Sequence, residues 1–205
     1  MTIHTTIQSI FTAAAVGCAL TSSTAFAQAS DSSSKPKPTS PWEFVVNSGT
    51  LIPTGAQGNA IKRGGVSAAQ LTYVIRPMFA ITSTAGWARS KDIATADNPK
   101  LDVFTYDVGA EVRASHWGLG ESLTFAPFAG AGAGGRSYNY RNLDVDATHN
   151  LAMYGSVGSE LGVRRVRVRF EARDYVTGFK PLLAGGASRT GNDVVLMVGL
   201  RLVSR

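Results

Sequence analysis

Apolar and polar residues alternate with a period of two along the chain from Trp42 onward, most clearly in Leu101–Ser115. From Phe104 on, one face of this segment carries aromatic, valine and alanine residues, and the other carries polar, charged or glycine residues. Because side chains alternate across a β-strand, the segment is predicted to be a strand with one apolar and one polar face. Val166–Tyr175 repeats the pattern, with Phe170 among the apolar residues and three arginines on the opposite face.

Six further segments alternate less strongly and are also predicted to be strands: Trp42–Ile52, Val66–Arg76, Phe79–Arg89, Ser122–Tyr138, Asn150–Arg164 and Asp193–Val203. Short turns are expected at 76–78, 116–120 and 164–165, and long polar loops at 53–65, 90–100, 141–148 and 180–192. Short turns that alternate with long loops are typical of outer-membrane barrels, in which the turns and both ends of the barrel domain face the periplasm. The predicted fold class is therefore all-β, an eight-stranded antiparallel up-and-down transmembrane β-barrel.

A soluble periplasmic or secreted β-barrel that binds a small ligand is the alternative, because its strands would alternate as well. Three features favour a membrane. The polar faces mix glycine with charges of both signs, which suits a narrow, filled lumen, and the apolar faces are almost free of charge, as lipid requires. Aromatic residues also gather near strand ends, where we expect interfacial girdles. They are Trp42, Phe44, Trp87, Phe104, Tyr106, Trp117, Tyr138, Tyr140, Tyr175 and Phe179.

The first 41 residues are predicted to lie outside the barrel domain, which spans 42–205. Residues 1–27 contain the apolar run Ile10–Leu20 and end in Ala25-Phe26-Ala27, so we expect a signal peptide that is cleaved before Gln28. Residues 28–41 are rich in serine, proline and lysine and are predicted to form a flexible leader. The only cysteine, Cys18, lies in the signal peptide, where a sequence similar to a lipobox leaves lipid attachment as an alternative.

The polar faces hold the charged residues that we expect to meet inside the barrel. They are Asp107, Glu111, Arg113, Glu160, Arg164, Arg167, Arg169, Glu171, Arg173 and Arg201. The interior of an eight-stranded barrel is only wide enough for side chains, and buried charges must be paired and hydrogen-bonded. We therefore predict a structural network of ion pairs that fills the lumen. Arginines outnumber acids in this set, so some are expected to reach water or anionic headgroups at the rim. A narrow channel is the alternative.

No catalytic, cofactor or metal site is predicted, and the chain is not expected to be an enzyme. After residue 27 the only histidines are His116 and His149. His116 follows Ser115, but adjacent strand residues point to opposite faces. His149 lies near Asp144 and Asp146, where a solvated loop is favoured over a metal site. The net charge of +6 comes largely from lumen and turn residues without a recognition motif, so nucleic acid is not an expected partner.

Trp42–Arg205 resembles the small outer-membrane β-barrel domain family of the OmpA/OmpX type. The resemblance rests on the eight-strand plan and on Phe125–Gly135 (FAPFAGAGAGG), Arg169–Tyr175 (RFEARDY) and Val194–Leu202 (VVLMVGLRL). It implies a monomer in the cell outer membrane, with outer-membrane lipid as its surroundings and a structural or surface-interaction role. An extracellular partner would be contacted through the loops. The chain departs from the family in its last residues, Leu202–Arg205, which lack the aromatic residue with which members commonly end.

Overall fold

The computed structural model describes residues 40–95, 97–118, 123–141, 143–144, 146–163, 166–179 and 189–203. The predicted signal peptide (1–27), nearly all of the predicted leader (28–41) and Arg164 lie outside these ranges. The described elements are β1 (Trp42–Thr54), α1 (Gly55–Gly58), β2 (Gly64–Arg76), β3 (Phe79–Lys91), β4 (Lys100–Arg113), β5 (Trp117–Gly118), β6 (Leu123–Tyr140), β7 (Thr148–Val163), β8 (Val166–Phe179) and β9 (Arg189–Val203). Among the described residues, no helix is long and apolar enough to cross a membrane.

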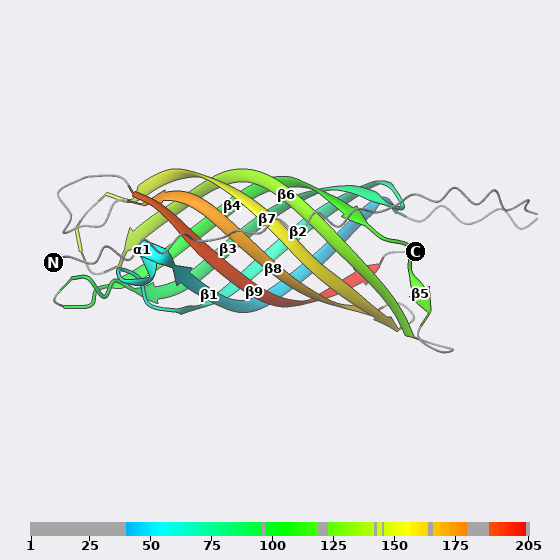
Figure 1. Cartoon of the computed structure of the whole chain (residues 1–205), viewed down its shortest axis with the longest axis horizontal. Coiled ribbons are helices and arrows are strands. Elements are labelled where there is room, and N and C mark those ends of the chain that lie inside the picture. The colour runs from blue at the N-terminus through cyan, green and yellow to red at the C-terminus, as the bar shows by residue number, and fades with distance from the viewer. Residues whose placement is uncertain are drawn as a thin grey trace, which may run out of the picture. The chain divides into compact units, whose positions relative to one another are not determined.

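The eight long strands close into one antiparallel barrel (Figure 1). The strand order is β4-β3-β2-β1-β9-β8-β7-β6, and a further pairing of β4 with β6 closes the ring. Each long strand pairs with the long strands next to it in sequence, and β1 pairs with β9. The two-residue β5 adds only a short pairing to β6, through Trp117 and Gly118. The predicted fold class, an eight-stranded up-and-down barrel, is confirmed.

The alternation in each strand decides which side chains face outward. On β4, Tyr106, Val108 and Val112 are each at least half exposed, whereas Asp107 and Glu111 are buried. Because a closed barrel has one inside and one outside, the polar face of β4 lines the lumen and its apolar face forms the outer wall. Both faces of this strand lie where the period-two pattern predicts them.

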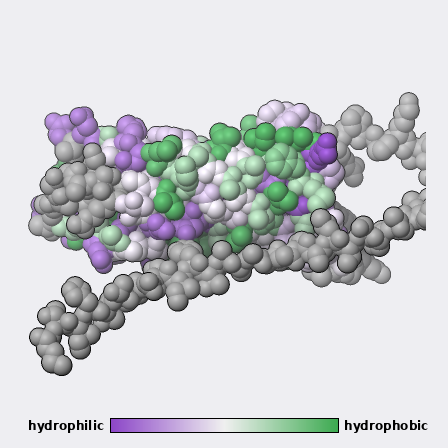
Figure 2. All heavy atoms as spheres, turned by 45° about the horizontal axis from the view of Figure 1, so that its top comes forward, coloured by the Kyte–Doolittle hydropathy of each residue, from purple (hydrophilic) through white to green (hydrophobic). Residues whose placement is uncertain are grey.

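Large apolar side chains project from the outer wall on seven of the eight long strands, and β6 presents exposed alanines instead. Examples are Val46, Leu71, Ile81, Val108, Val157, Phe170 and Leu200. Figure 2 shows apolar residues along the middle of the visible wall and strongly hydrophilic residues at the end that carries α1. An exterior this apolar suits contact with hydrocarbon and would be a large exposed patch in water.

Three of the tyrosines that we expected in the aromatic girdles face the lumen instead. Tyr138, Tyr140 and Tyr175 are 2%, 7% and 4% exposed, whereas Trp42 and Trp117 are about half exposed on the outside. The reason is strand parity, because each of the three tyrosines lies an even number of residues from a lumen-facing arginine on its own strand. The predicted girdles are therefore wrong at these three positions.

The predicted connections differ from the structure mainly at the end with α1. The first long loop contains α1, and Ile61 beyond it forms a β-bridge with Asp92. β8 continues to Phe179 and β9 begins at Arg189, so the predicted loop 180–192 is shorter than expected. At the opposite end, β4 ends at Arg113 instead of Ser115, and β5 lies in the predicted turn.

Candidate functional site: the charged lumen

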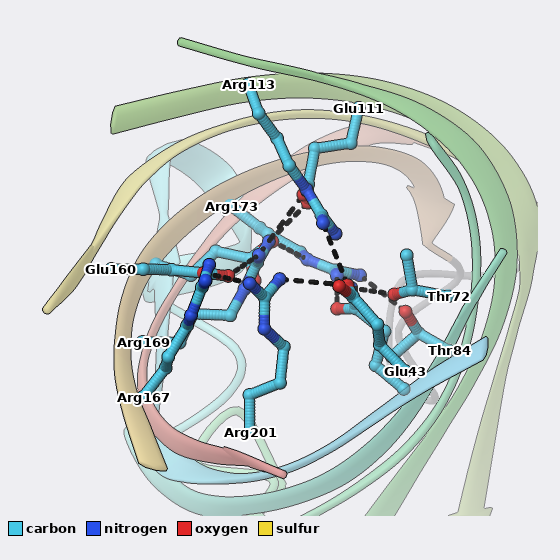
Figure 3. A network of polar contacts seen from close by, with 12 residues as sticks. Glu43, Thr72, Thr84, Glu111, Arg113, Glu160, Arg167, Arg169, Arg173 and Arg201 are labelled. Carbon is cyan, nitrogen blue, oxygen red and sulfur yellow. Dashed lines mark hydrogen bonds and ion pairs between the residues drawn. The ribbon is translucent and has the colours of Figure 1, made fainter. Parts of the chain in front are cut away.

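Six charged side chains in the β5 half of the lumen form a closed ring in which glutamates and arginines alternate (Figure 3). The members are Glu43 on β1, Glu111 and Arg113 on β4, Glu160 on β7, Arg169 on β8 and Arg201 on β9. All six occupy the inward parity of their strands. The ring crosses the interior of the barrel, because it joins strands from opposite sides of the closed sheet.

The ring is built from close ion pairs. Arg113 bridges Glu43 at 2.8 Å and Glu111 at 2.6 Å. Arg169 bridges Glu111 at 2.5 Å and Glu160 at 3.0 Å. Arg201 completes the ring through Glu160 at 2.6 Å and Glu43 at 2.9 Å. Charge-assisted contacts at such distances are the strong ones, and each arginine of the ring pairs with two of the ring's carboxylates.

A branch of the network continues along the lumen toward the α1 end. Glu171 accepts hydrogen bonds from Arg169 at 2.9 Å and from Arg173 at 2.5 Å. Arg173 also pairs with Asp107 at 3.1 Å and donates to Gln70 at 2.9 Å. Tyr175 donates to the same Asp107 carboxylate at 2.8 Å. These bonds replace the water that the buried charges lose.

A separate ion pair lies further toward the α1 end. The Arg136 guanidinium bonds Asp193 and lies over the ring of Tyr175, 4.6 Å from its centre. Sequence reasoning missed Arg136, Asp193 and the ring member Glu43. Their inward parity was the available signal, because each lies in phase with other lumen residues of its strand.

Counted over the described residues, the ion pairs in the lumen join six arginines to six carboxylates. The arginines are Arg113, Arg136, Arg167, Arg169, Arg173 and Arg201, and the carboxylates are Glu43, Asp107, Glu111, Glu160, Glu171 and Asp193. The expected excess of arginines is therefore wrong for this part of the chain, because Glu43 and Asp193 supply the missing acids. Every described residue of the predicted lumen set lies in this network. Arg164 is outside the described residues.

Two glycines of the inward faces leave room for aromatic rings that lie beneath arginines. A Cβ at Gly158 would collide with the Phe128 ring, and one at Gly109 would collide with the Tyr154 hydroxyl. Arg169 lies 3.6 Å from the centre of Phe128, and Arg173 lies 4.7 Å from the centre of Tyr154. The glycines therefore position the rings, and the rings provide cation–π contacts for two fully buried guanidinium groups.

The α1 half of the lumen is packed differently, mainly with apolar side chains. Its buried cluster includes Leu51, Ile61, Val66, Leu101 and Val103. This region also holds a few polar contacts between the connections and the barrel wall. Gln57 of α1 donates to the Tyr138 hydroxyl at 2.9 Å, and Tyr140 donates to Asp92 at 2.7 Å. The first connection thus lies across the lumen as a stopper, with Gln57 and Ile61 almost completely buried.

His116 lies in the connection after β4, near the β5 end of the lumen. Its Nε2 is 2.5 Å from an Arg167 guanidinium nitrogen. Because a guanidinium only donates, Nε2 accepts this hydrogen bond and carries no proton. Burial and the charge of Arg167 lower the pKa of His116. Asp144, Asp146 and His149 form no group that could hold a metal ion, and none was found elsewhere in the described residues.

No family model and no curated protein matches the chain. Several solved structures do match. Neisserial surface protein A has a TM-score of 0.59 at 13% identity, over 81% of this chain and 99% of that chain. The outer membrane protein AlkL in lipid bilayers has a TM-score of 0.52 at 15% identity, over 87% and 97% of the two chains. OprG from Pseudomonas aeruginosa, also an outer membrane protein, has a TM-score of 0.50 at 10% identity, over 80% and 96%. The chain therefore has the fold of small bacterial outer-membrane barrels, as the sequence resemblance predicted.

Proposed function

We propose that this chain is a non-enzymatic barrel of the bacterial outer membrane with a structural or surface-interaction role. We also propose that its lumen is closed by a plug of side chains. The observation that carries the proposal is the closed ring of Glu43, Arg113, Glu111, Arg169, Glu160 and Arg201. The ring occupies the interior with side chains that are mutually neutralised, and the stopper at the α1 end adds a second closure. Neither feature suits the transport of ions.

The outer wall supports the membrane part of the proposal. Val108, Val157 and Leu200 are each more than half exposed on strands whose opposite faces are charged. A soluble barrel that binds a small ligand would have the reverse arrangement, with an apolar interior and a polar exterior. The interaction role is assigned to the long connections at the α1 end, since loops carry the variable chemistry of rigid scaffolds.

Cysteine labelling on intact cells tests the location and the orientation. Asp97 is exposed in a long connection at the α1 end, and Arg76 is exposed at the end of β2, beside a short turn at the other end. An impermeant maleimide should react with Asp97→Cys and leave Arg76→Cys unlabelled until the cells are broken. Labelling of Arg76→Cys alone would invert the topology. Recovery of the wild-type chain in the soluble periplasmic fraction would favour the soluble alternative.

Conductance in planar bilayers tests the plug. The wild-type chain should show no steady single-channel current. The double variant Glu111→Ala/Arg169→Ala removes one acid and one base from the ring, so it keeps the net charge and should admit measurable current. Folding of both proteins is checked by the shift of the unheated band on a gel. Robust currents from the folded wild-type chain would contradict the plug and favour the narrow channel.

A further inference from the structure

A groove of about 360 Å³ at the α1 end is lined almost entirely by basic side chains. Its lining residues are Lys62, Arg63, Arg89, Ser90, Lys91, Lys100 and Arg141. All six basic residues are exposed, and they come from four separate segments of the chain. None of them belongs to the lumen network, so the ion pairs of the lumen do not account for this basic groove.

The strand register places like charges side by side in the groove. Lys91 lies directly opposite Lys100 in the β3–β4 ladder. The Lys62 backbone N–H donates to the carbonyl of Lys91 at 2.9 Å, and that of Arg141 donates to Lys100 at 3.1 Å. Like charges directly opposite each other in a sheet are destabilising. Asp102 lies opposite Arg89 in the same ladder and forms an ion pair with Arg141 at 3.2 Å, so it offsets part of this charge. A bound anion would relieve the remaining repulsion.

The outer wall next to the groove changes from charged to aromatic to apolar along β3 and β4. Arg89 and Lys91 share the outward parity of β3 with Trp87, and the Arg89 guanidinium lies 4.1 Å from the centre of the Trp87 ring. Trp87 lies opposite Phe104 in the ladder, and their stacked rings have centres 6.5 Å apart. The next outward pair along the ladder is Ala85 and Tyr106. This order matches a membrane boundary, in which cations meet headgroups and aromatic rings lie just beneath.

We propose that the basic groove binds the phosphate group of a lipid in the membrane leaflet at the α1 end, with the acyl chains along the wall beneath Trp87. The inference rests on the proposed function, because it requires the barrel to lie in a bilayer. A phosphomonoester suits the groove, because a compact group with more than one negative charge can contact Lys91 and Lys100 together. The continuous aromatic and apolar wall favours a lipid over a soluble sulfated polysaccharide, which would have no use for it.

Fluorescence of Trp87 can report the lipid beside it. The chain has three tryptophans, and Trp42 and Trp117 lie at the opposite end of the barrel. The variant Trp42→Phe/Trp117→Phe therefore keeps one reporter next to the groove. The purified chain is inserted into phosphatidylcholine bilayers that contain a small fraction of brominated phosphatidic acid or, separately, brominated phosphatidylcholine. Bromine atoms quench tryptophan on contact, so enrichment of one lipid appears as stronger quenching.

Brominated phosphatidic acid should quench Trp87 several-fold more efficiently than brominated phosphatidylcholine at equal content. Adding Lys91→Gln/Lys100→Gln should remove most of the difference, since each basic residue near a charged lipid surface contributes on the order of fivefold in binding. Arg89 is left in place because it touches the reporter. Arg76→Gln, which removes an exposed base at the opposite end, is the control and should leave the preference unchanged.

Each contrary result has a distinct meaning. Equal quenching by the two lipids in an inserted barrel would overturn the inference and leave the proposed function intact. An equal loss of preference in Arg76→Gln would replace the groove with a general attraction to net charge. Displacement of the lipid by inorganic phosphate or by a sulfated oligosaccharide would overturn the assignment to a lipid. Absence of quenching by either lipid would refute the membrane location, and the inference with it.

Discussion

The two halves of the lumen are filled mainly by different kinds of side chain, although the Arg136–Asp193 ion pair lies on the α1 side. On the β5 side, Arg169 contacts three carboxylates and is 1% exposed, whereas on the α1 side Leu101 is fully buried among apolar neighbours. Both side chains are almost completely buried. An apolar half can adjust to small changes of shape, but a charged half is stable only while every charge keeps its partners. We therefore expect the two halves to respond differently to the same size of change.

The largest effect is expected for Arg169→Met, which leaves Glu111, Glu160 and Glu171 without their shared partner. Removal of one member of a buried ion-pair network typically costs about 3–5 kcal/mol. The free energy of unfolding in lipid bilayers, measured by urea titration, should fall by this amount. The control is Val168→Leu, at the preceding residue of β8, which points outward and stays apolar. Equal stability of the two variants would mean that Arg169 is solvated in the folded barrel.

A smaller loss is expected for Leu101→Ala in the apolar half. Truncation of a buried leucine costs about 2–5 kcal/mol, and we expect the lower part of this range because the adjoining connections can close over the space. The conservative variants sharpen the contrast. Leu101→Met should cost about 1 kcal/mol or less, because it roughly conserves volume. Arg169→Lys should cost more, because an ammonium group cannot reproduce the guanidinium fork. The reverse order in urea titrations would refute the distinction between the halves.

The smallest of these effects is expected where a glycine makes room for an aromatic ring of the charged half. Gly158→Ala would press its Cβ against the Phe128 ring beneath Arg169 and against the Phe170 carbonyl oxygen, and overpacking of this kind costs about 1–3 kcal/mol. Gly155→Ala on the same strand is the matched control, because its Cβ would meet nothing within 4 Å. Comparable unfolding midpoints for the two variants would show that Phe128 and the backbone at Phe170 can move aside without loss.

The period of two was enough to predict the eight long strands and the faces of those with strong alternation. Glu111 and Arg113 lie in such a strand, β4, and could be assigned to the lumen from sequence. Glu43 could not be assigned as easily, because it lies between Trp42 and Phe44 in a strand of weak contrast. The tyrosines show the opposite error, in which residue type was given more weight than parity. Tyr138 and Tyr140 are in phase with Arg136, so an assignment by strand parity would have placed them in the lumen.

The pairing of the lumen charges and the stopper lay beyond what the sequence could predict. Which carboxylate meets Arg201 depends on the shear of the closed barrel, and no local pattern encodes that quantity. The helix α1 is only four residues long and has no apolar period. Its place follows from tertiary contacts, above all the hydrogen bond between Gln57 and Tyr138. The basic groove is similar, because its residues come together through the register of β3 and β4 and through the backbone hydrogen bonds that join Lys62 and Arg141 to these strands.

The closed ring of charges has a consequence for how the barrel assembles. Glu43 lies on β1 and Arg201 on β9, the first and last strands, whose pairing joins the two ends of the sheet. In a sheet that is still open, these two residues lie on opposite edges, and the acid and the base each lack one ion-pair partner. An open intermediate inside hydrocarbon would therefore hold uncompensated charge at both edges, which is costly. Closure satisfies both edges at once, so the ring makes the last strand pairing cooperative and disfavours opening of the β1–β9 seam.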